Sequence, residues 1–207
     1  GTSATIPFGN TRIQKGGTYN SLFDILIAPA QTTANSAEGV DDSGERIRFN
    51  MQRLTSILDF DLTNSTSDPI RCVLLTAESD DFLSAKSLNF DLAQGEAAAP
   101  ALDTEERSKS ILINFDGGSA SAAAQLDAFF NVLPGNYNLN LDIITATKQM
   151  ASVKIDRTDK PFEAGVLYKK EVGTLTPSAI PAPSLDWPDQ DIDATHEITV
   201  GPDQSLT

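Results

Sequence analysis

The chain has very few of the residues that most often carry out chemistry. Its 207 residues include one cysteine, Cys72, and one histidine, His196. A single cysteine excludes an intramolecular disulfide. A lone histidine with no second soft ligand near it in the sequence indicates neither a zinc site nor a catalytic triad. We therefore expect no catalytic residue, no metal ligand and no cofactor.

Basic residues and long apolar runs are also scarce. Lys and Arg number 15 against 29 Asp and Glu, which gives a formal net charge of −14. A surface of this charge repels nucleic acid phosphates and anionic membranes. No apolar run approaches the roughly 20 residues of a membrane-spanning helix. The sequence therefore predicts a non-enzymatic protein with no nucleic acid partner and no membrane span.

What the chain has in abundance is alternation of apolar and polar residues. Every second residue is apolar from Leu126 to Val132 and again from Tyr137 to Ile143, which is typical of strands with one buried face. Between them, Leu133-Pro134-Gly135-Asn136 has the composition of a tight reversal, with a glycine free to take positive φ. The pattern predicts a hairpin of two long strands.

Similar patterns recur along the chain, and they predict an all-β fold. About ten short strands without a convincing long helix favour an antiparallel β-sandwich with long loops. A short helix competes with strand only in the alanine-rich segment 119–127. Besides the hairpin, strands are predicted at Leu22–Ala28, Arg46–Met51, Leu54–Leu62, Ile70–Thr76, Ser87–Leu92, Lys109–Phe115, Met150–Asp156, Gly165–Thr174 and Asp191–Val200.

Composition divides the chain into three parts. Residues 1–44 form a leading segment, either an edge strand or the remnant of a preceding domain. Residues 45–187 carry the β-sandwich domain. Residues 188–207 form a C-terminal tail with one candidate strand, after a connector in which prolines exclude regular structure.

Some patterns resemble ligand sites only in part. The spacing of Asp189, Asp191 and Asp193 begins like a calcium loop, but Ala194 and Val200 replace the required glycine and glutamate. An acidic connector is the simpler interpretation, and a looser calcium site stays open. Asn64-Ser65-Thr66 is a glycosylation sequon, which matters only in a glycosylating compartment.

Four short motifs follow one another along the chain: Phe23–Ala28, Arg46–Met51 leading into Leu54–Leu62, Leu133-Pro134-Gly135-Asn136-Tyr137, and Phe162–Tyr168 followed by Trp187. The third motif by itself resembles the last strands of transthyretin-like sandwiches, which implies a Greek-key arrangement. Together the four resemble the fimbrillin-like subunits of type V pili and related surface proteins of Gram-negative anaerobes. The chain departs from this family in having no histidine in Arg46–Met51 and too little sequence before Leu22 for a full first domain.

The resemblance implies a cell-surface fimbrial subunit or adhesin that is exported to the outer membrane as a lipoprotein. In that family a terminal strand is removed by proteolysis, and a strand from a neighbouring subunit of like fold takes its place. The physical basis is strand addition to a free sheet edge. Further partners would be host or bacterial surface ligands. The candidate donor residues are Ile192, Ala194, Ile198 and Val200; the same alternation also fits a strand that pairs within its own domain.

The alternative function is a surface carbohydrate-binding or nutrient-capture module. It would require Trp187, Tyr168 and Tyr137 to lie exposed on one face as stacking aromatics. Trp187 equally fits an anchor for the tail. A hydrolase would need His196 beside an acid and a serine in a cleft, and it ranks last. Whether a pilus subunit of this kind forms the shaft, the tip or the anchor is not decided by the sequence.

Overall fold

The computed structural model describes residues 3–28, 51–78, 82–91, 101–102, 107–115, 125–157 and 159–179. Regular structure in these segments is β-strand, apart from one 3₁₀ turn, η1 (Ser21–Phe23). No helix among them has the length and apolarity needed to cross a membrane. The predicted strand Asp191–Val200 and most of the predicted strand Arg46–Met51 lie outside the described residues.

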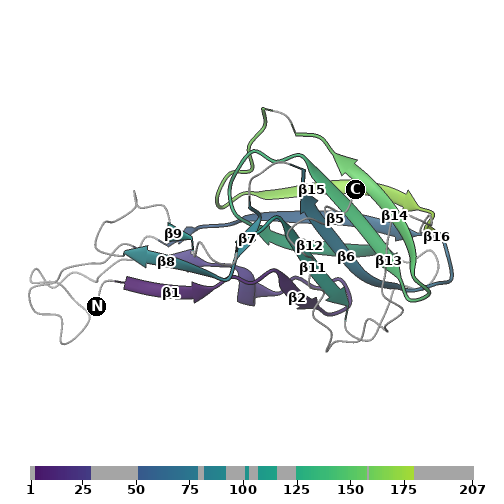
Figure 1. The fold of residues 1–207 in the computed structure, drawn as a ribbon, viewed down its shortest axis with the longest axis horizontal. Helices are drawn as coiled ribbons and strands as arrows, with labels where there is room; N and C mark the ends of the chain where they lie inside the picture. The colour runs from purple at the N-terminus through teal and green to yellow at the C-terminus, as the bar shows by residue number, and fades with distance from the viewer. Residues whose placement is uncertain are drawn as a thin grey trace, which may run out of the picture.

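Two sheets form the main body of the molecule (Figure 1). The larger has six strands in the order β16-β14-β13-β6-β11-β2, and the smaller has three in the order β12-β5-β15. The six are β2 (Thr11–Gln14), β6 (Ile70–Ala77), β11 (Ser110–Phe115), β13 (Leu139–Thr145), β14 (Gln149–Ile155) and β16 (Ser178–Ala179). The three are β5 (Ser56–Asn64), β12 (Gln125–Val132) and β15 (Leu167–Leu175).

Three small sheets complete the described structure. A three-stranded sheet in the order β1-β8-β9 extends away from the main body at one end (Figure 1). Two short pairs, β3–β4 and β7–β10, lie where the chain enters or leaves the longer strands. Their bounds are β1 (Ser3–Pro7), β3 (Leu26–Ile27), β4 (Gln52–Arg53), β7 (Ser84–Ala85), β8 (Ser87–Asp91), β9 (Ala101–Leu102) and β10 (Arg107–Ser108).

The core lies between the two main sheets, and alternation along the strands accounts for it. In β5, Leu58, Phe60 and Leu62 are buried on the inner face, where they meet inward residues of β6, β11, β12 and β13 in one continuous cluster. After β5, the chain forms β6 and β11 in the six-stranded sheet and then returns as β12 to pair with β5. This return to an earlier strand is a Greek-key feature. The predicted all-β sandwich is therefore confirmed.

Two strand pairs differ from the wholly antiparallel expectation. β2 runs parallel to β11, and β15 runs parallel to β5. Both parallel strands lie at a sheet edge and pair with strands far away in the sequence. A tight turn, which would impose an antiparallel pair, therefore does not connect them.

The predicted hairpin between Leu126 and Ile144 is wrong as a pair of hydrogen-bonded strands. β12 pairs with β5, whereas β13 pairs with β6 and β14 in the opposite sheet. The chain does reverse at Leu133–Asn136, but the reversal carries it from one sheet to the other. Alternation identified both strands correctly, yet a face pattern does not specify which strand is the neighbour.

Three other local predictions also need correction. The proline-containing connector before the tail, predicted to have no regular structure, includes the two-residue strand β16, which pairs with the start of β14. Leu22–Ala28 is not a buried strand: only Leu26–Ile27 is extended and paired, and Leu22 is 85% exposed. The cause is Asn20, whose Oδ1 accepts a hydrogen bond from Leu22 N at 3.1 Å and stabilises the 3₁₀ turn. In segment 119–127, the described residues Gln125–Asp127 belong to strand β12 and not to a helix.

Candidate functional site at the sheet edges

A sandwich of this type offers its sheet edges for backbone pairing with other chains. The three-stranded sheet of the main body, β12-β5-β15, has two edges, the outer side of β12 and the outer side of β15. They differ in how the described chain covers them. The candidate site is therefore built from the residues that flank each edge.

Gln14 closes part of the β12 edge with its side chain. β2 pairs through its backbone with β11 in the six-stranded sheet, yet its inward side chains reach β12 in the other sheet. Gln14 Nε2 donates to Asp127 O at 2.6 Å, and Phe129 N donates to Gln14 Oε1 at 3.0 Å. One amide thus satisfies a carbonyl and an N–H of β12, much as an adjoining strand would.

Arg12 continues this closure one step along β12. Its Nη1 donates to Asn131 O at 2.7 Å and its Nη2 donates to Gly9 O at 2.9 Å. The guanidinium lies 4.6 Å from the ring centroids of both Phe8 and Phe23. Arg12 is 3% exposed, and burial lowers its pKa to about 10. It remains a cation at neutral pH, held by carbonyls and aromatic rings.

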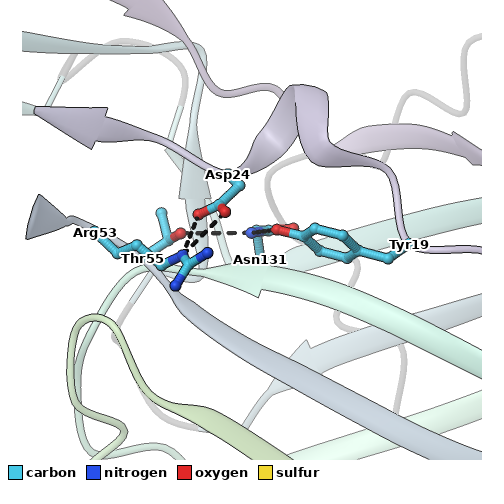
Figure 2. Close-up of polar contacts among 5 residues, drawn as sticks. All are labelled: Tyr19, Asp24, Arg53, Thr55 and Asn131. Carbon is cyan, nitrogen blue, oxygen red and sulfur yellow. Dashed lines mark hydrogen bonds and ion pairs between the residues drawn. The ribbon is translucent and has the colours of Figure 1, made fainter. Parts of the chain in front are cut away.

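A polar cluster then fastens the chain after β2 to the same edge (Figure 2). Asn131 Nδ2 donates to Tyr19 OH at 3.2 Å and to Thr55 Oγ1 at 3.5 Å. The Tyr19 ring meets the Phe129 ring edge to face at 5.6 Å. Burial raises the pKa of Tyr19, so its hydroxyl stays protonated at neutral pH. The segment from β2 to Tyr19 therefore covers β12 along most of its length.

The same cluster joins two segments that the sequence analysis singled out. Arg53 Nε lies 3.0 Å from each carboxylate oxygen of Asp24. Asp24, next to η1, has a side chain that is 8% exposed, whereas Arg53 on β4 is about half exposed. This ion pair fixes the segment between β2 and β3 against the start of the long strand β5.

The β15 edge is different, because among the described strands β15 pairs with β5 alone. Ile57 N donates to Val166 O at 3.0 Å. Backbone groups alternate in a parallel ladder, so Leu167, Lys169 and Glu171 direct their N–H and C=O groups away from β5. No strand within the described part of the chain pairs with this side. The free edge ends at a bulge between Glu171 and Gly173, where Gly173 has a φ of +83°.

Apolar side chains are incompletely covered on this side of the sandwich. β12 lies opposite β2, at one end of the six-stranded sheet. The order of strands within the two sheets therefore places β15 toward β14, near the other end (Figure 1). We call this β14–β15 margin the open side. Five hydrophobic residues that pack on the main core while remaining partly exposed all lie on its two strands: Ala151, Val153, Ile155, Tyr168 and Val172.

Charges follow the free edge of β15. Lys169 Nζ lies 3.4 Å from Asp59 Oδ2 and 3.8 Å from Asp127 Oδ1, across the outer face of the three-stranded sheet. Burial raises the pKa of Asp59, and the lysine offsets this only in part. The Asp59 carboxylate in turn raises the pKa of Lys169. Lys170 next to it is exposed and contributes a second positive charge at the edge.

The loop between β14 and β15 bounds one end of the open side and contacts the Leu-Pro-Gly reversal. Phe162 and Gly135 exchange two backbone hydrogen bonds, of 2.7 and 3.0 Å. The Phe162 ring stacks on Tyr137 and meets Tyr168 edge to face. Arg157 lies over both Phe162 and Tyr168. Two of the four family-like motifs thus form one aromatic cluster.

The aromatic residues predicted to stack on a ligand do not share an exposed face. Tyr137 is 3% exposed, and its hydroxyl donates to Leu133 O at 2.9 Å and Pro134 O at 3.0 Å. The prediction of Tyr137 as an exposed stacking residue is therefore wrong, because its ring is part of the core. Tyr168 is partly exposed, but its ring packs against Phe162 and Arg157. Trp187 lies outside the described residues.

The remaining predicted sites have the following outcomes. The donor residues Ile192, Ala194, Ile198 and Val200, together with His196 and the acidic connector, lie outside the described residues. No group of three or more His, Cys, Asp or Glu side chains within the described segments is arranged to hold a metal ion. Asn64 of the sequon is fully buried and its Nδ2 donates to Asp68 O at 2.8 Å, so the folded chain cannot carry a glycan there.

Sequence reasoning missed Arg12 and Gln14, the residues that close the β12 edge. The sequence predicted the leading segment only as an edge strand or the remnant of a preceding domain. The one local signal for a strand at Thr11–Gln14 is the absence of proline and glycine, because the single apolar residue there, Ile13, faces outward. More than 110 residues of sequence separate Gln14 and Arg12 from the residues of β12 that they contact. No local pattern predicts such contacts.

Comparisons with known proteins support the fold. The sequence matches no protein-family model and no curated protein. The structure is similar to that of a candidate cell adhesion protein from Bacteroides uniformis ATCC 8492, with a TM-score of 0.51 and 18% identity over 86% of this chain. A candidate cell adhesion protein from Bacteroides ovatus ATCC 8483 has a TM-score of 0.40 and 14% identity over 75% of this chain. The chain spans 66% and 59% of their respective lengths. The first likeness bears out an all-β fold of this type.

Proposed function

We propose that this protein is a non-enzymatic adhesion module of the cell surface, a fimbrial subunit or fimbrillin-like adhesin that joins subunits of like fold by strand addition. The observation that carries the proposal is the open side. Its free edge, Leu167–Glu171, lies beside apolar residues of β14 and β15 that the core leaves partly exposed. An incoming strand would complete the backbone ladder and cover these side chains together.

The tail of the chain supplies a strand of suitable pattern. In Asp191–Val200, the apolar residues Ile192, Ala194, Ile198 and Val200 share one face, and acids lie on the other. Lys170 is exposed on β15 and gives this edge a positive charge that suits the acidic face, whereas Lys169 is paired with Asp59 and Asp127. The described chain reaches β16, which pairs with the start of β14 at the open side, before the tail follows in sequence. We propose this segment of a neighbouring copy as the donor.

A further point supports the surface role. The similar protein from Bacteroides uniformis is described as a candidate for cell adhesion. We extend the proposal to export, an outer membrane location and a lipid anchor in the precursor, each testable by fractionation of the native cell.

The test compares four forms of the protein by sedimentation velocity. The full chain is expected to assemble, and a chain truncated after Trp187 is not, while both melt at the same temperature. Lys169→Pro removes an outward N–H and is expected to stop assembly, whereas Lys169→Ala keeps that N–H and assembles. A lower melting temperature of the truncated monomer would instead show that the tail pairs within its own domain, and the donor role would be lost.

A further inference from the structure

Within the described residues, the β12 edge is covered by side chains and not by the backbone of another strand. Three outward groups, Asp127 O, Phe129 N and Asn131 O, accept from or donate to the side chains of Gln14 and Arg12. Gly17 adds to this cover, since a Cβ there would lie 3.1 to 3.3 Å from Leu126 and the Asp127 backbone. The following chain then lays Tyr19 on Phe129.

Burying the Arg12 cation in this cover costs free energy. Arg12 is a buried cation that bonds to carbonyl groups, and its Nε has no hydrogen-bond partner among the described residues. Removing a charge from water without a paired carboxylate is unfavourable. An apolar residue at this position would pack between Phe8 and Phe23 at lower cost. It would leave the Asn131 carbonyl of an edge strand unsatisfied and open to another chain.

We propose that Arg12 and Gln14 form an edge cap that prevents β12 from pairing with β12 of a second copy of this chain. A second copy fits the uncapped edge. In a two-fold antiparallel pair centred on Phe129, Asp127 of one copy faces Asn131 of the other, so like charges do not meet. With β12 capped, the sheet β12-β5-β15 keeps one edge, that of β15, to which no described strand is paired. Association through this sheet then takes place at the β15 edge alone.

This inference concerns the edge opposite the open side and does not require that the open side accept a strand. The test therefore uses a Lys169→Pro background, in which association at β15 is blocked. The double variant Arg12→Ala/Gln14→Ala removes both side chains, and with them their bonds to β12 and the space that they occupy over its edge. The matched control is Ile13→Gln, which changes the neighbouring residue of β2 whose side chain is 63% exposed.

Two measurements decide the outcome: hydrogen exchange of the Phe129 amide and sedimentation equilibrium. The double variant is expected to exchange Phe129 faster at protein concentrations at which it is monomeric, and to dimerise at least about tenfold more tightly than the control. Adding Phe129→Pro, which removes an outward N–H together with the Phe129 ring, should abolish the dimer, whereas Phe129→Ala, which removes the ring alone, should keep it. A folded double variant that stays monomeric, or a dimer that survives Phe129→Pro, overturns the proposal.

A variant with a smaller change covers the case in which the double variant does not fold. Gln14→Glu keeps an acceptor for Phe129 N but places a carboxylate against Asp127 O, where an amide donor lay at 2.6 Å. It is expected to accelerate exchange of Phe129 and to dimerise measurably above the control at the same protein concentration. Unchanged exchange together with an unchanged mass would show that Gln14 does not cap the edge.

Discussion

Gly135 and Tyr137 are in contact in a way that permits no side chain at the glycine. A Cβ on Gly135 would lie 2.4 Å from both Cζ and the hydroxyl oxygen of Tyr137. The sequence analysis explained this glycine by its freedom to take positive φ, but Gly135 is not among the residues with positive φ. The requirement is space: the Tyr137 ring lies over the glycine while its hydroxyl bonds back to the reversal.

Replacing Gly135 with alanine is therefore expected to destabilise the fold. The added methyl group must displace the buried Tyr137 ring or the paired backbone of Phe162, and overpacking of this kind costs about 1–3 kcal/mol. Urea denaturation measures the change in free energy of unfolding. The matched control is Gly9→Ala, because a Cβ at Gly9 meets nothing within 4 Å. Equal stabilities of the two variants would contradict the packing argument.

Tyr137→Phe tests the hydroxyl separately from the ring. The hydroxyl donates to Leu133 O at 2.9 Å or to Pro134 O at 3.0 Å. Its loss is expected to lower the free energy of unfolding by about 1 kcal/mol, since Tyr137 is buried and loses its hydrogen bond to the reversal. Tyr168→Phe serves as the comparison, because the Tyr168 hydroxyl lies in an exposed contact with Glu163 N. A larger effect at Tyr168 than at Tyr137 would refute this account.

Asp68 predicts a pH dependence of stability in the acid range. Slight burial raises its pKa, but hydrogen bonds from Thr145 and Thr147 outweigh this and lower the pKa below its ordinary value of 3.8. The folded state therefore binds fewer protons than the unfolded state in this range, and stability from Asp68 rises with pH. That stability is fully present above pH 3.8 and is lost as the pH falls through the folded pKa.

The variant Asp68→Asn removes this contribution and is expected to cost about 1 kcal/mol at neutral pH. The difference in unfolding free energy between the native protein and the variant should shrink as the pH falls below 3.8. Urea titrations at a series of pH values measure it. A difference that stays constant into strong acid would show that the Asp68 charge does not bind the turn at Thr147.

Cys72 is expected to be inert in the folded protein. It is buried within β6, and burial raises its pKa to about 11 against a small opposing effect of Arg71. The thiolate fraction at pH 8 is then about 100-fold lower than for a free thiol, in addition to steric protection. Labelling with a thiol reagent should be slow in buffer and fast in denaturing urea. Equal rates in the two conditions would place the thiol at the surface.

The strands themselves were predictable from local residue patterns. Alternation in β5 and β12, and the apolar run of β6, identified each strand to within about two residues, because alternation reports which side chains face a core. The β13 pattern likewise marked a strand with one buried face. The same patterns misjudged Leu22–Ala28, where one hydrogen bond donated by Leu22 N to Asn20 Oδ1 outweighs the preference of an apolar run for the core.

The sequence by itself determined that this protein is an all-β sandwich, and which residues of the described strands fill its core. Only the tertiary structure decided which strands are neighbours, why Gly135 must be glycine, and which edge of the three-stranded sheet is closed. The physical reason is that an alternating pattern encodes a buried face but no partner. The partners of Arg12 and Gln14 lie on β12, more than 110 residues away, and are chosen by packing of the whole chain.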